Sequence, residues 1–133
     1  MTTVRSELTE RVKTLATMLS IQVAYEGNSF TKPANSAAFL EMFIIPANTM
    51  DVTVDGRRQR ETGYMQINVW SKQGVGTMQG ETIANTIKSA FPLVPKTGTV
   101  SIEATPTIKQ GILDNSGYRI IPVVIPYRHE AEV

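Results

Sequence analysis

The most apolar run of the chain is Ala38-Phe39-Leu40-Glu41-Met42-Phe43-Ile44-Ile45, and Pro46 closes it. A run this short, and this rich in aromatic and branched side chains, predicts a β-strand rather than a helix. It holds more apolar side chains than a strand covered on one face can hide in a small domain. Two interpretations stay open: the strand is buried on both faces, or part of its apolar surface meets a second subunit. For the second interpretation the candidate interface residues are Phe39, Met42, Phe43 and Ile44.

Other segments alternate apolar and polar residues, which is typical of half-buried strands. They span residues 21–25, 50–54, 64–70 and 100–104. Two further segments repeat apolar residues at steps of three and four, which predicts amphipathic helices. The first helix is expected from about Thr3 to Leu19, with Thr2 or Thr3 as its cap. The second is expected to start at Thr77 and to stop at Pro92.

A polar segment between the strands expected at 50–54 and 64–70 carries the main cluster of positive charge. It consists of Arg57-Arg58-Gln59-Arg60-Glu61-Thr62-Gly63. We expect the two strands to pair antiparallel through it, as a long hairpin loop. Arg57, Arg58 and Arg60 are candidates for contact with an acidic partner, and a mobile solvated hairpin tip is the alternative of equal weight. Nucleic-acid binding ranks behind both, because no aromatic residue is interleaved to stack bases.

The last third of the chain is expected to form strands and turns. Asp114-Asn115-Ser116-Gly117 is a strong turn signal. In the β-rich run 118–127, Pro122 and Pro126 lack a ladder donor, so we expect that strand at a sheet edge, or kinked or bulged. The order of elements predicts an α+β fold. A largely antiparallel sheet, or a mixed one, would pack with two main helices in a single domain over residues 1–133.

The composition excludes several classes of function. The chain has 133 residues, of which 41% are hydrophobic and 19% charged, enough for one domain with a buried core. Its formal net charge of +1 is too near neutral for a protein that binds nucleic acid mainly through phosphates. With no cysteine and one histidine, disulfides, cysteine nucleophiles and Cys/His zinc sites are excluded. We expect a soluble protein with no export signal or membrane span.

Three features could carry chemistry, and for each we favour a structural interpretation. His129 lies in a charged C-terminal segment without a catalytic motif, so we expect a solvated residue. Gly74-Val75-Gly76-Thr77 lacks the Lys-Ser/Thr ending of a phosphate loop and is expected to be a flexible connection. Asp51 and Asp55 share the polar side of one expected strand, which favours a solvated face over a metal site. We therefore predict no catalytic, cofactor-binding or metal-binding residue, and no cofactor.

Four local sequences carry a family resemblance. They are the helix leading into Val23-Ala24-Tyr25-Glu26-Gly27-Asn28-Ser29-Phe30, the strand ending in Ile45-Pro46, the segment Glu61-Thr62-Gly63-Tyr64-Met65-Gln66-Ile67-Asn68-Val69, and the loop Gly74-Val75-Gly76 opening Ile83-Ala84-Asn85-Thr86-Ile87-Lys88-Ser89-Ala90-Phe91. Up to Phe91, the chain resembles the tail-terminator-like proteins of long-tailed bacteriophages, also called tail-completion or minor tail proteins. These motifs are structural and include no catalytic signature.

The resemblance implies a non-enzymatic structural protein of the virion. Such a protein forms a ring, expected to be a hexamer, on the head-proximal end of the tail tube, where it stops tube polymerisation and presents a surface to the filled head. The implied partners are further copies of the chain, the tail tube protein and the head–tail connector protein. DNA would only pass through the lumen, and no membrane is involved. The implied location is the virion, and the host cytoplasm during assembly.

Burial and charge supply the candidate contacts within this picture. Contacts between different surfaces make a ring when they close on themselves. The candidates for neighbour contact are Phe39, Met42, Phe43 and Ile44, and those for docking or for lining the channel are Arg57, Arg58 and Arg60. Two alternatives stay open: another head–tail joining or neck protein, or a small nucleic-acid-binding module that uses the arginine loop. An enzyme ranks last, because the motifs supply no nucleophile–base pair or metal cluster.

Overall fold

The computed structural model describes residues 4–25, 38–51, 58–72, 78–91, 100–113 and 118–132. Its elements follow in the order α1 (Val4–Leu19), β1 (Gln22–Tyr25), β2 (Phe39–Asp51), β3 (Arg58–Lys72), α2 (Met78–Ala90), β4 (Val100–Ile102), β5 (Thr107–Ile108), β6 (Ile112–Leu113) and β7 (Tyr118–Glu132). Both expected helices are confirmed. Their expected caps, Thr2, Thr3 and Thr77, lie outside the described residues.

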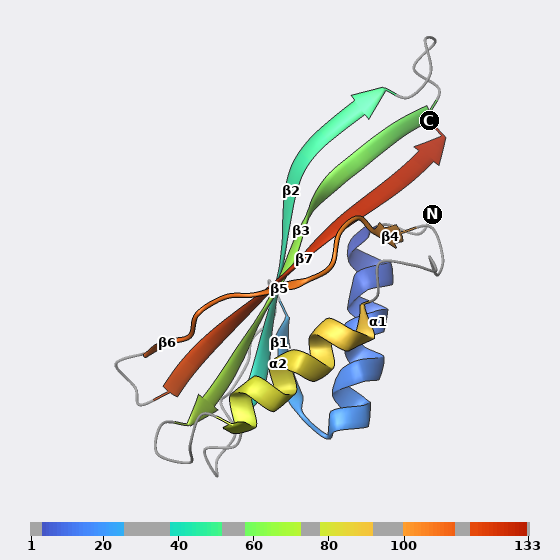
Figure 1. Cartoon of the computed structure of the whole chain (residues 1–133). Coiled ribbons are helices and arrows are strands. Elements are labelled where there is room, and N and C mark those ends of the chain that lie inside the picture. Colours follow the sequence, from blue (N-terminus) through green and yellow to red (C-terminus); the bar gives the residue numbers. More distant parts are fainter. Residues whose placement is uncertain are drawn as a thin grey trace.

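The strands form one mixed sheet in the order β1-β2-β3-β7-β4, and β5 and β6 also pair with β7. β1 runs parallel to β2, while the other described pairings are antiparallel. The expected α+β class is therefore correct, with a sheet that is mixed rather than purely antiparallel. Both helices lie on one face of the sheet, and β2, β3 and β7 twist strongly and continue beyond the helices (Figure 1).

The core lies between the helices and the sheet face that they cover. Alternate residues of each strand point to this face, and the apolar stripe of each helix packs against them. Buried side chains come from α1, from the three long strands, and from α2 with the residue that follows it: Leu8, Val12, Leu15, Leu40, Met42, Ile44, Met65, Ile67, Val69, Ala84, Ile87, Phe91, Ile121, Val123 and Ile125. Where the long strands lie under the helices, one residue in two is thus buried in the core.

The turn from α1 into β1 depends on Ser20. This residue has a φ of 54°, the left-handed conformation that ends many helices. Its main-chain N–H donates to the carbonyl of Thr17 at 3.2 Å, and the N–H of Ile21 donates to that of Ala16 at 3.0 Å. The last carbonyls of α1 are satisfied in this way, and the chain is free to start a strand within two residues.

β2 is longer than the sequence analysis predicts. Pro46 does not end the strand, because β2 runs to Asp51 with an irregularity in the register between Pro46 and Asn48. Among the described residues, β1 pairs only with positions 39–42 of β2. Pro46 therefore lies where β2 is the edge of the sheet, one of the few places where a strand accepts proline.

The position of β7 differs from the edge strand that the sequence pattern predicts. β7 is not an edge strand, since it pairs without interruption with β3 from Tyr118 to Glu132 and with β4, β5 and β6 on its other side. The carbonyl of Pro122 accepts from the N–H of Lys109, and that of Pro126 accepts from the N–H of Glu103. The amide positions of both prolines face this same side, because a strand residue directs its N–H and C=O in one direction. Neither proline therefore removes a hydrogen bond to β3.

Candidate interaction surface

The sheet face opposite the helices, here called the open face, is the candidate functional surface. Strand alternation and register place Glu41, Phe43 and Ile45 of β2 on it, together with Tyr64, Gln66, Asn68 and Trp70 of β3 and Pro122, Val124, Pro126 and Arg128 of β7. All of these side chains are exposed or half-buried. Neither described helix covers this face (Figure 1).

A ladder of hydrogen bonds fixes the polar part of the open face. The side-chain amide of Gln66 donates to that of Asn68 at 2.8 Å, and the Asn68 amide donates to the Glu41 carboxylate at 3.1 Å. The Trp70 indole N–H donates to the same carboxylate oxygen, also at 3.1 Å. The Glu41 carboxylate is thus held in one orientation by neutral donors.

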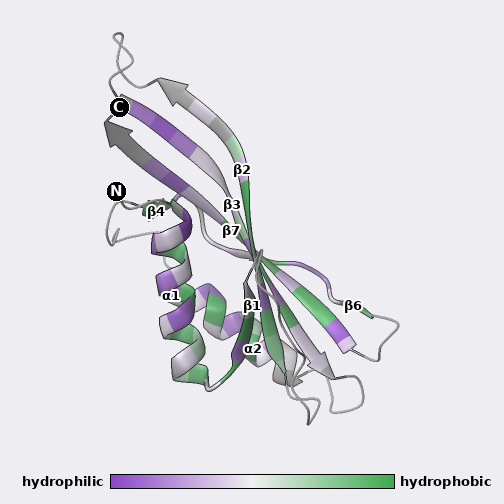
Figure 2. Cartoon of the chain, turned by 180° about the vertical axis from the view of Figure 1, so that it is seen from behind, coloured by the Kyte–Doolittle hydropathy of each residue, from purple (hydrophilic) through white to green (hydrophobic). Residues whose placement is uncertain are grey.

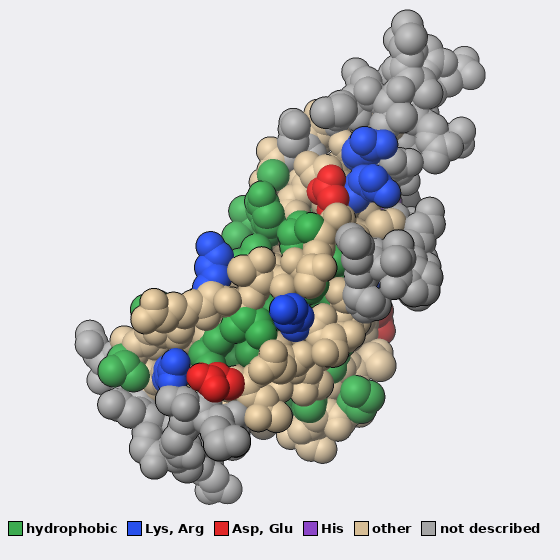
Figure 3. Space-filling view, viewed as in Figure 1, with side chains coloured by type: hydrophobic (Ala, Val, Ile, Leu, Met, Phe, Trp, Pro, Cys, Tyr) green, Lys and Arg blue, Asp and Glu red, His purple; other side chains and the backbone are tan. Residues whose placement is uncertain are grey.

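Beside this ladder lies an apolar band that stays accessible in the single chain. Ile45 and Tyr64 are direct cross-strand partners, and their side chains are 47% and 45% exposed. Pro126 of β7 pairs with Tyr64 on the side away from Ile45. Phe43, two residues before Ile45 on β2, is half-buried. Figure 2 shows hydrophobic residues along the middle of the long strands and hydrophilic ones toward the end of the sheet where β3 begins and β7 ends. In Figure 3, apolar side chains likewise reach the surface over the middle of the molecule.

An aromatic cluster closes the other end of the open face. The rings of Phe39 and Trp70 stack with centroids 5.2 Å apart, and Tyr118 contacts both rings edge-on. Phe39 is buried as a result, although it lies on the face without a helix. Aromatic pairs of this kind stabilise a sheet surface beyond the area that they bury.

The four candidate interface residues of β2 therefore differ in position. Met42 and Ile44 belong to the core under the helices, and Phe39 is buried in the aromatic cluster. Phe43 is the member of the set whose side chain is half-buried on the open face. Ile45 and Tyr64, which the candidate set omits, are more exposed. Strict alternation along residues 39–45 is the signal that separates the two groups.

The arginine cluster does not lie in a hairpin loop, contrary to what the sequence pattern predicts. β3 begins at Arg58, and Arg60 lies within it opposite Met50, half-buried and with an interaction partner. The reason is that β2 continues to Asp51, so that the two strands pair over most of the polar segment. Arg57 lies outside the described residues, as do Asp55 and the glycine loop 74–77.

His129 is not a solvated terminal residue, because β7 carries it into the sheet, where it pairs with Val100 of β4. Its side chain points to the helix-covered face, and the residue is 8% exposed. The Nδ1 atom lies 3.7 Å from a carboxylate oxygen of Glu61 and has no hydrogen-bond partner. Close by, burial raises the pKa of the Tyr127 hydroxyl, and the Glu61 carboxylate raises it further. Among the described residues no group of three His, Cys, Asp or Glu side chains is arranged to hold a metal ion.

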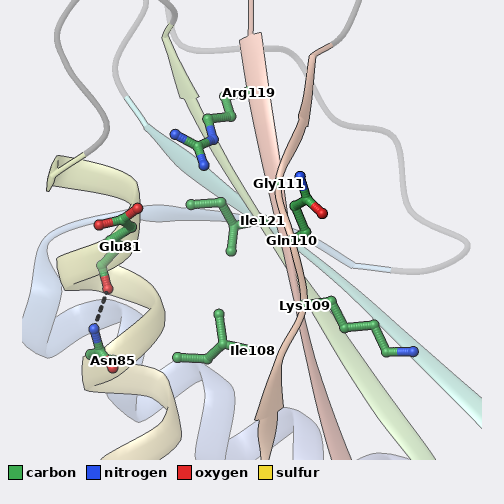
Figure 4. A pocket seen from close by; sticks show the side chains of 8 residues that line it. All are labelled: Glu81, Asn85, Ile108, Lys109, Gln110, Gly111, Arg119 and Ile121. Atoms are coloured by element: carbon green, nitrogen blue, oxygen red, sulfur yellow. Dashed lines mark hydrogen bonds between the residues drawn. The ribbon is translucent and has the colours of Figure 1, made fainter.

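A recess of about 280 Å³ lies between α2 and the last strands. Glu81 and Asn85 line it from α2, Ile108 and Ile121 form its apolar wall, and Arg119 enters from β7 (Figure 4). Its charges are of both signs, and the Asn85 amide is engaged by the carbonyl of Glu81 at 3.0 Å. The lining residues include no nucleophile–base pair.

Comparison with known proteins assigns this architecture to a class. The family described as phage tail terminator protein matches residues 3–127. The chain belongs to this family, and it is a structural protein of the phage tail and virion. No curated protein matches it significantly. None of the described helices has the length and apolar character needed to span a membrane.

Two solved structures share the fold. One, which carries no functional description, is 23% identical with a TM-score of 0.72, and the match covers 95% of this chain and 92% of that chain. The other is a chain from the virion of a native gene transfer agent particle. It is 12% identical with a TM-score of 0.63, over 92% of this chain and 91% of that chain. At these identities the similarity establishes a common fold and no more.

Proposed function

We propose that the protein ends the tail tube. Copies of the chain would form a ring, expected to be a hexamer, on the head-proximal end of the tube, stop further addition of tube subunits and offer the head–tail connector a surface to join. The observation that carries the proposal is the family match over residues 3–127. Assembly would take place in the host cytoplasm, DNA would pass through the ring, and no catalytic step is involved.

The open face supports a role based on contacts. An apolar band centred on Ile45 and Tyr64 lies beside a fixed carboxylate, on a sheet face with no described helix over it. Exposed apolar surface of this kind is typical of sites that meet another protein. A ring needs repeated contacts between two different surfaces of the same chain, and the two ends of the open face differ in chemistry.

Tube polymerisation with and without the protein tests the proposal. Purified tail tube protein is polymerised alone, then with increasing amounts of the terminator chain, and tube lengths are measured by electron microscopy. We expect shorter tubes and a label at one end of each tube when the chain carries a tag. Unchanged lengths with unlabelled ends would contradict the proposal. A chain that binds purified heads but not tubes would favour the alternative neck role instead.

A further inference from the structure

Two side chains of opposite charge on the open face have no charged partner within the residues that the structure describes. Glu41 accepts hydrogen bonds only from the neutral side chains of Asn68 and Trp70. Arg128, half-buried on β7, makes no hydrogen bond or ion pair there. Charges held in half-buried positions without a counter-charge are costly for a single chain and favourable in a complementary contact.

The two charges cannot neutralise each other within one molecule. Glu41 lies in register with Asn68 of β3, whereas Arg128 lies in register with Thr62. Six residues along a strand correspond to about 20 Å, at about 3.3 Å per residue. That distance is beyond the reach of the two side chains, so neither supplies the counter-charge of the other within the described part of one chain.

Each charge lies beside one part of the apolar band, and the two parts adjoin between Phe43 and Ile45 of β2. We call the part of the sheet formed by residues 45–51, 58–64 and 126–132 the arm, and the rest of the three long strands the base. The arm presents Ile45, Tyr64 and Pro126 next to Arg128. The base presents Phe43 and Val124 next to Glu41. Each patch therefore adjoins a side chain without a charged partner among the described residues, Arg128 on the arm and Glu41 on the base, and the two charges are opposite in sign.

The twist of the sheet separates these patches in direction. β2, β3 and β7 turn strongly between base and arm, so that the open face of the arm and that of the base do not lie in one plane (Figure 1). Two neighbouring copies could therefore take one patch each, which would be a heterologous contact that closes into a ring or continues as a filament.

We propose that the arm of one copy packs on the base of a second copy, with Arg128 of the first paired to Glu41 of the second. This inference rests on the proposed ring and names the surfaces that form it. The Asn68 and Trp70 donors hold the Glu41 carboxylate ready for the guanidinium. Ile45 and Tyr64 of the arm meet Phe43 and Val124 of the base, which removes apolar surface of both copies from water.

Charge reversal followed by mixing tests the pairing. Glu41→Arg alone and Arg128→Glu alone each place like charges at every contact between copies. We therefore expect the fraction of tube ends that carry the chain to fall about tenfold or more. An equimolar mixture of the two variants restores opposite charges at every contact between a Glu41→Arg copy and an Arg128→Glu copy. The mixture should therefore recover the fraction of tube ends that carry the chain. Circular dichroism checks the fold, and Glu41→Gln, which keeps an acceptor for Asn68 and Trp70, should weaken assembly as well. Full occupancy with either reversal, or no recovery in the mixture, would overturn the inference.

Crosslinking distinguishes this contact from a two-fold one and from failure of the proposed function. The chain has no cysteine, so Glu41→Cys with Arg128→Cys introduces the only thiols. A short bis-maleimide is used, because an Arg–Glu pair spans more than a disulfide. On tube ends we expect a ladder beyond dimers, absent when Arg119→Cys replaces Arg128→Cys. Dimers alone, or no product on tubes that are capped, would contradict the arm-to-base contact while the proposed function stands. Tubes that the parent chain does not cap would contradict the function itself.

Discussion

The Glu7 carboxylate of α1 accepts a hydrogen bond of 2.7 Å from the main-chain N–H of Val100, 93 residues further along the chain. Arg11, one helical turn after Glu7, donates to the carbonyl of the same Val100 at 2.9 Å and lies 3.5 Å from the Glu7 carboxylate. The two side chains thus satisfy both main-chain groups of a residue at the end of the sheet order. They attach the first helix to β4 and so hold it over the core.

Glu7→Gln should destabilise the fold through this attachment. A hydrogen bond from a main-chain amide to a carboxylate is charge-assisted, and its loss or weakening is expected to lower the free energy of unfolding by about 1–3 kcal/mol. Glu10→Gln is the matched control, since Glu10 is an exposed acid of the same helix. Urea unfolding of the three proteins measures the difference. Equal losses in both variants would show that the contact with Val100 contributes nothing specific.

Gly63→Ala tests the close approach of β2, β3 and β7. A Cβ at position 63 would lie 2.6 Å from the main-chain oxygen of Ile45 and 2.7 Å from the Tyr127 hydroxyl oxygen. Because a main-chain atom cannot move aside, we expect a loss of about 1–3 kcal/mol in the free energy of unfolding.

Gly111→Ala is the comparison for this effect. Its nearest obstacle is the side chain of Arg119, at 2.6 Å, which can change rotamer. Thermal unfolding of both variants should show the larger decrease for Gly63→Ala. The reverse order would mean that the strands around Gly63 adjust more easily than their spacing indicates.

Met42→Asp and Phe43→Asp should have opposite consequences although the residues are neighbours. Met42 is 2% exposed, and a carboxylate there has no partner, so we expect loss of the cooperative fold, at a cost of more than about 4 kcal/mol. Phe43 is half-buried on the open face, so Phe43→Asp should fold and fail to occupy tube ends. Circular dichroism melts separate the two. Unfolding of Phe43→Asp would make Phe43 a core residue and remove it from the proposed contact.

Alkaline titration should reveal the burial of Tyr127. Its pKa is raised above the usual value, chiefly by burial, so the native state binds this proton more tightly than the unfolded chain does. The stability that this group contributes is present below the ordinary tyrosine pKa of about 10 and is lost as pH rises through the raised value.

Tyr127→Phe should therefore lose less stability than the parent above about pH 10, because it has no phenol to ionise. Tyr64→Phe, at an exposed position, serves as the control. Urea midpoints measured at intervals from neutral to alkaline pH provide the comparison. Parallel pH profiles for the parent and Tyr127→Phe would contradict the assignment.

The helices and the class of fold follow from local patterns in the sequence. Apolar residues at steps of three and four determine which stripe of α1 and of α2 packs inward, and this holds whatever the position of the sheet. Alternation likewise assigns residues such as Met65 and Ile67 to one face and Gln66 and Asn68 to the other. The resemblance to tail terminators rests on these same local sequences, and family membership confirms it.

Only part of the candidate surface could be found in this way. The sequence identifies β2 as unusually apolar, but local composition does not say that Phe39 is covered by Trp70, which lies 31 positions later and meets it only through strand pairing. Ile45 and Tyr64 become one exposed band for the same reason. Glu41 and Arg128 also share a face only because β3 joins their strands.

The sequence by itself determined which segments are helical, which residues alternate toward the core and how little reactive chemistry the chain contains, because these depend on near neighbours. The tertiary structure decided the rest. Pro46 continues a strand because β2 is an edge there, Pro122 and Pro126 are accepted because their amide positions face away from β3, and His129 is buried because β7 extends past it. Each of these depends on which strand lies alongside, and that is settled by packing between segments far apart in the chain.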